Sequence, residues 1–161
     1  MQVRSRLSLY PLAAGVLLLG FGGIAGAQST DPLVGTWKLN LAKSTFSPGP
    51  APKAVTLRYE AAGQGLKVTV DSEAATGSTK WEYQAGFDGK DYAVTGNAQA
   101  DMVSLKRLTS TSSEAAFKKG GKATTTSTRA VSADGKTLTI TTKGTNTEGK
   151  TVNDVQVFER Q

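Results

Sequence analysis

The chain of 161 residues contains no cysteine and no histidine. These two absences exclude disulfides, thiol redox chemistry, Ser-His-Asp and Cys-His catalytic groups, and the common zinc sites. No glycine-rich phosphate loop and no nucleophile elbow occurs either. The sequence therefore predicts a protein that is not an enzyme and that binds no metal and no cofactor.

A concentrated basic surface is also missing. The formal net charge is +6, but the lysines and arginines are mostly scattered singly along the chain. Binding of nucleic acid requires a basic patch or stripe. The charge pattern therefore predicts a solvated surface and no nucleic-acid partner.

Long apolar runs are absent except for residues 12–24. This run is shorter than the ~20 residues of a membrane-spanning helix, follows two arginines, and precedes the small-residue sequence Ala-Gly-Ala. Residues 1–27 are thus predicted to be a secretory signal peptide. We expect residues 28–161 to form one exported domain, periplasmic or extracellular, with no integral membrane segment after cleavage.

The exported part is dominated by apolar residues that alternate with polar ones, the pattern of β-strands. Glycine-containing turns such as Asp88-Gly89 and Asp134-Gly135 separate the runs and favour hairpins. The predicted strands are 35–41, 54–60, 66–73, 79–87, 90–95, 102–109, 113–118, 122–132, 136–143 and 151–159.

Consecutive hairpins form an antiparallel meander, and an open meander of this length would expose two unpaired edges. We therefore predict an all-β protein: an up-and-down antiparallel barrel of about ten strands. Residues 47–52 contain three prolines, which favour an extended segment rather than a helix or strand. This segment is expected to cross one end of the barrel.

Three short motifs resemble the calycin superfamily, which includes lipocalins and fatty-acid-binding proteins. Gly35-Thr36-Trp37-Lys38-Leu39 is similar to their first strand, and residues 155–160 are similar to their closing strand. Arg129 followed by Asp134-Gly135-Lys136 resembles strands eight and nine of fatty-acid-binding proteins. The chain also resembles small bacterial exported proteins described as lipocalin-like. The resemblance implies that Trp37 packs across one end of the barrel beneath a basic side chain, for which Arg160 is the candidate.

Two departures separate the chain from fatty-acid-binding proteins. Those proteins insert a helical lid after the first strand, which the proline-rich segment cannot form. Their closing strand carries an Arg-x-Tyr pair for the ligand carboxylate, and the matching residues here are Gln156 and Phe158. Gln156 can donate a hydrogen bond but carries no charge, so the resemblance does not transfer a fatty-acid ligand.

Arg129 has two possible orientations. It shares one strand face with Ser127 and Val131, and this face lines the barrel if it points inward. A buried arginine then requires an acidic partner, water or an anionic ligand. A shift of one residue in register would instead place Arg129 in solvent.

The aromatic residues Trp81, Tyr83 and Phe87 share a face, with Tyr59 on a neighbouring strand. They form either one wall of a ligand cavity or ordinary core packing, because small barrels are often filled by side chains.

Two functions follow. The first is a non-enzymatic binding protein that holds a small apolar or anionic ligand with Arg129, Trp81, Tyr83, Tyr59 and Gln156. The second is a protein-interaction or inhibitor-type module of the cell envelope that uses residues 44–53 and has a filled barrel. A cavity of ~300 Å³ or more that encloses Arg129 favours the first function.

Overall fold

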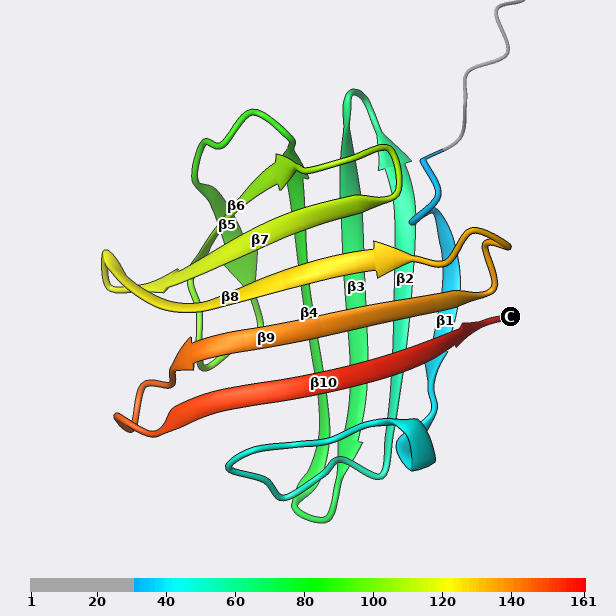
Figure 1. Cartoon of the computed structure of the whole chain (residues 1–161). Coiled ribbons are helices and arrows are strands. Elements are labelled where there is room, and N and C mark those ends of the chain that lie inside the picture. Colours follow the sequence, from blue (N-terminus) through cyan, green and yellow to red (C-terminus); the bar gives the residue numbers. More distant parts are fainter. Residues whose placement is uncertain (1–30) are drawn as a thin grey trace, which may run out of the picture.

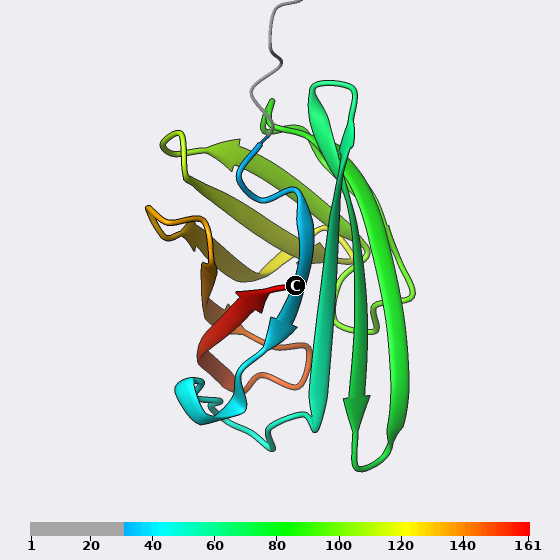
Figure 2. The same ribbon diagram turned by 90° about the vertical axis from the view of Figure 1, so that its right-hand side faces the viewer.

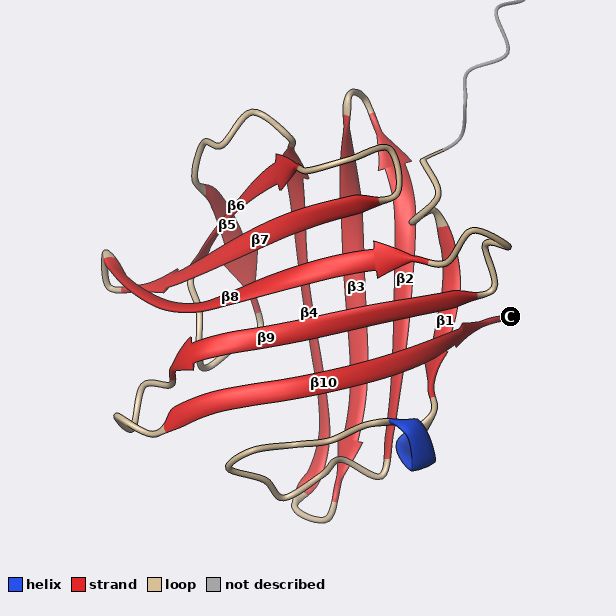
Figure 3. Ribbon diagram, in the orientation of Figure 1, coloured by secondary structure: helices blue, strands red, loops and turns tan. Residues whose placement is uncertain are grey.

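A computed structural model describes residues 31–161, so the predicted signal peptide lies outside the described residues. These residues form ten antiparallel strands joined into a closed barrel (Figures 1 and 3). The strands are β1 (Gly35–Leu39), β2 (Ala54–Ala62), β3 (Gly65–Ala74), β4 (Gly77–Gly86), β5 (Tyr92–Thr95), β6 (Met102–Arg107), β7 (Ser112–Lys119), β8 (Lys122–Val131), β9 (Thr137–Thr145) and β10 (Thr151–Arg160). The prediction of a ten-stranded up-and-down antiparallel barrel is confirmed.

The first strand is shorter than predicted. It ends at Leu39, and a 3-10 turn, Leu41–Lys43, follows. The Asn40 side chain accepts a hydrogen bond from the Lys43 amide at 3.1 Å and so caps this turn. Within residues 31–161 no helix has the length and apolar character needed to cross a membrane.

Each strand pairs with its neighbour in the sequence, and β1 pairs with β10 to close the barrel. In Figure 1, β2–β4 run steeply across the direction of β7–β10. Figure 2 shows these two groups of strands as facing walls, with β1 on the near side. Side chains that alternate along each strand therefore project from both walls into a shared interior.

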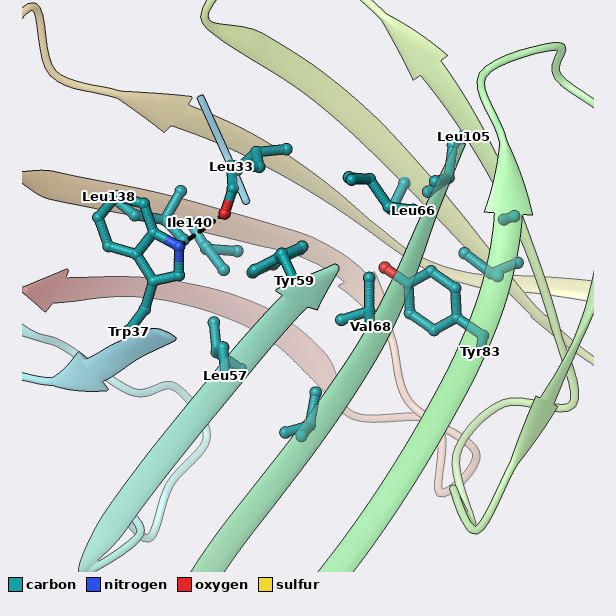
Figure 4. Packing of buried hydrophobic residues seen from close by; sticks show 14 of the residues in the cluster. Leu33, Trp37, Leu57, Tyr59, Leu66, Val68, Tyr83, Leu105, Leu138 and Ile140 are labelled. Carbon is teal, nitrogen blue, oxygen red and sulfur yellow. Dashed lines mark hydrogen bonds between the residues drawn. The ribbon is translucent and has the colours of Figure 1, made fainter. Parts of the chain in front are cut away.

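One end of the interior is filled by a dry apolar core. Trp37, Phe158, Leu138 and Leu105 are fully buried there. Leu33 closes this end, and its carbonyl accepts a hydrogen bond of 2.8 Å from the Trp37 indole nitrogen (Figure 4). Leu33, two residues before β1, thus acts as a plug for the barrel.

Arg160 fastens this plug. Its guanidinium lies 4.1 Å from the centre of the Trp37 ring. It also donates hydrogen bonds to the carbonyls of Pro32, Val34 and Gly135 at 2.6–2.7 Å. A β-carbon on Gly35 would lie 2.5 Å from Arg160 Nη1, which explains the glycine at this position. The expected placement of Arg160 over Trp37 is confirmed.

Residues 44–53, which we call the strap, cross the other end of the barrel, at the bottom of Figure 1. The strap is tied to β10 by a β-bridge between Thr45 and Val155 and by a 2.9 Å hydrogen bond from Asn153 N to Ser47 O. The predicted proline-rich crossing is therefore present.

Replacing Arg160 by alanine should lower the free energy of unfolding by about 2–4 kcal/mol, because three carbonyls lose a charged donor and Trp37 loses its cation contact. Urea denaturation followed by tryptophan fluorescence measures this change. Arg58→Ala is the matched control, since Arg58 is exposed and forms only a 3.8 Å ion pair with Asp71. Its expected effect is within about 0.5 kcal/mol. Equal losses in both variants would contradict the role assigned to Arg160.

Candidate functional site

The strap end of the barrel is not filled by side chains. A cavity of about 470 Å³ lies between the β2–β4 wall and the β8–β10 wall. Its mouth is formed by the strap, the β3–β4 turn and the β5–β6 loop, with Phe46, Pro52, Thr76 and Gln99 among the lining residues. The volume is in the range of small-molecule sites.

The β2–β4 wall of the cavity is apolar. Strand register places Leu57, Val70 and Trp81 in one row across the wall, and all three line the cavity. Phe117 of β7 meets Trp81 edge-on, with ring centroids 6.1 Å apart and planes at 81°. This geometry is favourable for aromatic pairs, so the rings form a preorganised surface for an apolar group.

The β8–β10 wall carries small polar side chains instead. Ser127 and Thr142 are partners in register and share a hydrogen bond of 2.8 Å between their hydroxyls. Gln156 of β10 also lines the cavity. The cavity thus has one apolar and one polar wall, an arrangement suited to an amphiphilic occupant.

Arg129 lies where the dry core meets the cavity. The next inward residue of β8 toward the end filled by Leu33 and Trp37 is Val131, which belongs to the core. Ser127, the next inward residue toward the strap, lines the cavity. Arg129 is only 3% exposed, which decides its orientation: it points into the barrel. Its Nη2 atom donates a 2.8 Å hydrogen bond to the hydroxyl of Tyr83, which reaches in from β4.

The charge of Arg129 is not neutralised by the part of the protein that the structure describes. No carboxylate lies within ion-pair distance of it there. Its Nε and Nη1 atoms are buried without a hydrogen-bond partner. The rings of Tyr59 and Tyr83 lie 5.9 and 6.0 Å from the guanidinium carbon, at the outer limit of a cation–π contact. Burial of an unpaired cation costs several kcal/mol, so an anion in the cavity would relieve a real penalty.

The two tyrosines remain neutral phenols beside this cation. Burial raises the pKa of Tyr59 to about 12, although the nearby Arg129 acts in the opposite direction. Burial likewise raises the pKa of Tyr83. For Arg129 itself, burial acts to lower the pKa, but the Tyr83 and Tyr59 oxygens more than offset it. At neutral pH the site therefore combines one guanidinium cation with phenol hydroxyls.

The structure brings together four of the five residues that the sequence nominated. Arg129, Trp81, Tyr59 and Gln156 line the cavity, whereas Tyr83 does not line it and instead holds Arg129.

Phe87, which was predicted on the same strand face, follows the last residue of β4 and lies outside the cavity, beneath Arg107 and 3.7 Å from its guanidinium carbon. The aromatic face is therefore divided between cavity and core. Sequence reasoning assigned no role to Phe117 or to Asp154, although Asp154 shares the inward face of Gln156, two residues away.

No protein-family model matches the chain, and no curated protein matches it. Among solved structures, the chain is similar to the siderocalin Ex-FABP, which functions through dual ligand specificities. The identity is 14%, the match covers 81% of this chain and 74% of that chain, and the TM-score is 0.40. No residue role is carried over from a likeness at this level.

If Arg129 is kept for a ligand rather than for the fold, Arg129→Met should raise the free energy of unfolding of the ligand-free protein by about 1–3 kcal/mol, because methionine fills a similar volume without a buried charge. Urea denaturation measures this change. Lys143→Met, at an exposed position on neighbouring β9, should change stability by no more than about 0.5 kcal/mol. A clear loss of stability in Arg129→Met would make Arg129 a structural residue.

Stability should also fall at alkaline pH. The pKa of Tyr59 is about 12 in the folded protein against 10.0 in its ordinary state, so between these values the unfolded chain releases a proton that the folded one retains. Stability contributed by neutral Tyr59 is present below pH 10 and is lost above it, by up to about 2–3 kcal/mol. Urea denaturation at pH 8 and pH 11 should show a smaller pH-dependent loss in Tyr59→Phe than in the wild type. Equal losses would contradict the assignment.

Proposed function

We propose that this protein is an exported, non-enzymatic binding protein that holds a small, partly apolar anion inside its barrel. One observation carries the proposal: a buried cation without an acidic partner in residues 31–161, Arg129, lies at the floor of a cavity of about 470 Å³. Export rests on the predicted signal peptide. The apolar wall around Trp81 would take the hydrophobic part of the ligand, and Arg129 its charge.

The cavity also bears on the alternative function. A protein-interaction module of the kind considered above would have a filled barrel, so that only its rim and strap met a partner. The open volume and the unpartnered nitrogens of Arg129 support a ligand inside the barrel instead.

A pair of fluorescent probes of similar shape tests this function. 1-Anilinonaphthalene-8-sulfonate carries an anion, and N-phenyl-1-naphthylamine is its neutral analogue. We expect both probes to bind the wild type. Arg129→Met should raise the dissociation constant of the sulfonate by about 10–100-fold and change that of the neutral probe by less than about 3-fold. Fluorescence titration gives both dissociation constants.

The matched control is Lys143→Met, which removes one exposed positive charge from adjacent β9. It should leave both dissociation constants within about 2-fold of the wild type, since exposed charges are screened by salt. Native mass spectrometry of protein purified from its own host then searches for a retained small molecule. Absence of probe binding, together with a pure ligand-free mass, would overturn the proposed function.

A further inference from the structure

Asp154 on β10 is the one acidic side chain among the residues found to line the cavity. It is half-buried and, within the described chain, has no lysine or arginine within ion-pair distance. Its Oδ1 atom accepts a hydrogen bond of 2.8 Å from the Ser47 amide of the strap. The cavity therefore contains a carboxylate as well as a guanidinium, and neither is neutralised by an ion pair in this part of the protein.

Attachment of the strap does not account for the charge of Asp154. Thr45 and Val155 exchange two backbone hydrogen bonds of 2.8 and 2.9 Å, and Ser47 O accepts a third from Asn153 N. A neutral amide oxygen could also accept the Ser47 amide proton, so the hydrogen bond itself does not require a charge. The strap is therefore held without the negative charge of Asp154, which no ion pair within residues 31–161 neutralises.

Strand register relates the two charges. Arg129 is opposite Ile140, which is opposite Gln156, and Asp154 lies two residues before Gln156 on β10. Spacings of about 4.8 Å between strands and about 3.4 Å per residue put the two α-carbons about 12 Å apart. Ser127 of β8 and Thr142 of β9, whose hydroxyls share a hydrogen bond, lie in one row across the sheet with Asp154. A polar stripe therefore runs along this wall from the cation at the floor to the carboxylate near the strap.

We propose that the ligand is dipolar, with an anionic group that meets Arg129 and an ammonium or similar cation that meets Asp154. This inference rests on the proposed function and names the ligand class of the same cavity. A ligand with only a carboxylate satisfies Arg129 and leaves Asp154 unpaired. An amino-carboxylate whose charges are separated by a chain of about 8–12 Å pairs with both, while its methylene groups lie against the apolar wall.

Octanoate and 8-aminooctanoate, which differ only in a terminal ammonium group, distinguish these ligand classes. Each is titrated against the bound sulfonate probe in wild type and in Asp154→Asn, which removes the charge but keeps an acceptor for the Ser47 amide. We expect Asp154→Asn to weaken the binding of 8-aminooctanoate by about 3–10-fold. The affinity for octanoate should stay the same or increase.

Asp71→Asn is the matched control, because Asp71 lies on the outer face of β3 beside Arg58 and Lys80 and its loss changes the net charge equally. It should leave the ratio of the two affinities unchanged. If Asp154→Asn leaves that ratio unchanged, or if 8-aminooctanoate fails to displace the probe from the wild type, the dipolar ligand is ruled out while anion binding stands. Failure of the sulfonate probe itself to bind overturns the proposed function, and this inference with it.

Discussion

Pairing between β1 and β10 is the contact on which the rest of the structure depends. It turns a meander with two unpaired edges into a barrel, so that inward side chains of every strand share one interior. β1 has only five residues, and its ladder with β10 is short. The plug around Leu33 and the guanidinium of Arg160 over Trp37 reinforce this seam by joining the chain before β1 to the last strand.

Once the barrel is closed, the sizes of the inward side chains decide where it is filled. At the plug end, Trp37, Phe158 and Leu138 occupy the interior and exclude water. At the strap end, inward positions of β8 and β9 hold small residues such as Ser127 and Thr142, and space remains. Arg129 lies at this boundary, so its guanidinium is shielded by the core on one side and meets the cavity on the other. A buried, unpaired charge in such a position lowers the stability of the ligand-free protein, and it is available to pair with an anionic ligand.

The strands were predictable because they depend on local features, namely period-2 alternation and glycine turns. Closure could be inferred as well, because an open meander of ten strands would leave two unpaired edges. The orientation of Arg129 was not predictable, since a single step in register reverses every side chain of β8. The position of each inward side chain along the barrel axis could not be predicted from the sequence either. Trp81, Tyr83 and Phe87 alternate in the sequence as if on one strand face. In the structure Trp81 lines the cavity, Tyr83 holds Arg129, and Phe87 packs beneath Arg107 just after β4 ends.

Local pattern alone therefore determines the all-β class, the ten strands, the strap and the pair of faces on each strand. The tertiary structure decides which inward side chains meet. Tyr83 of β4 reaches Arg129 of β8 across the interior, and Asp154 joins the same cavity through the register of β9 and β10. Such meetings depend on how far each strand is offset from the next when the sheet closes. That offset is set by pairing along the whole sheet and is not contained in any single segment of the chain.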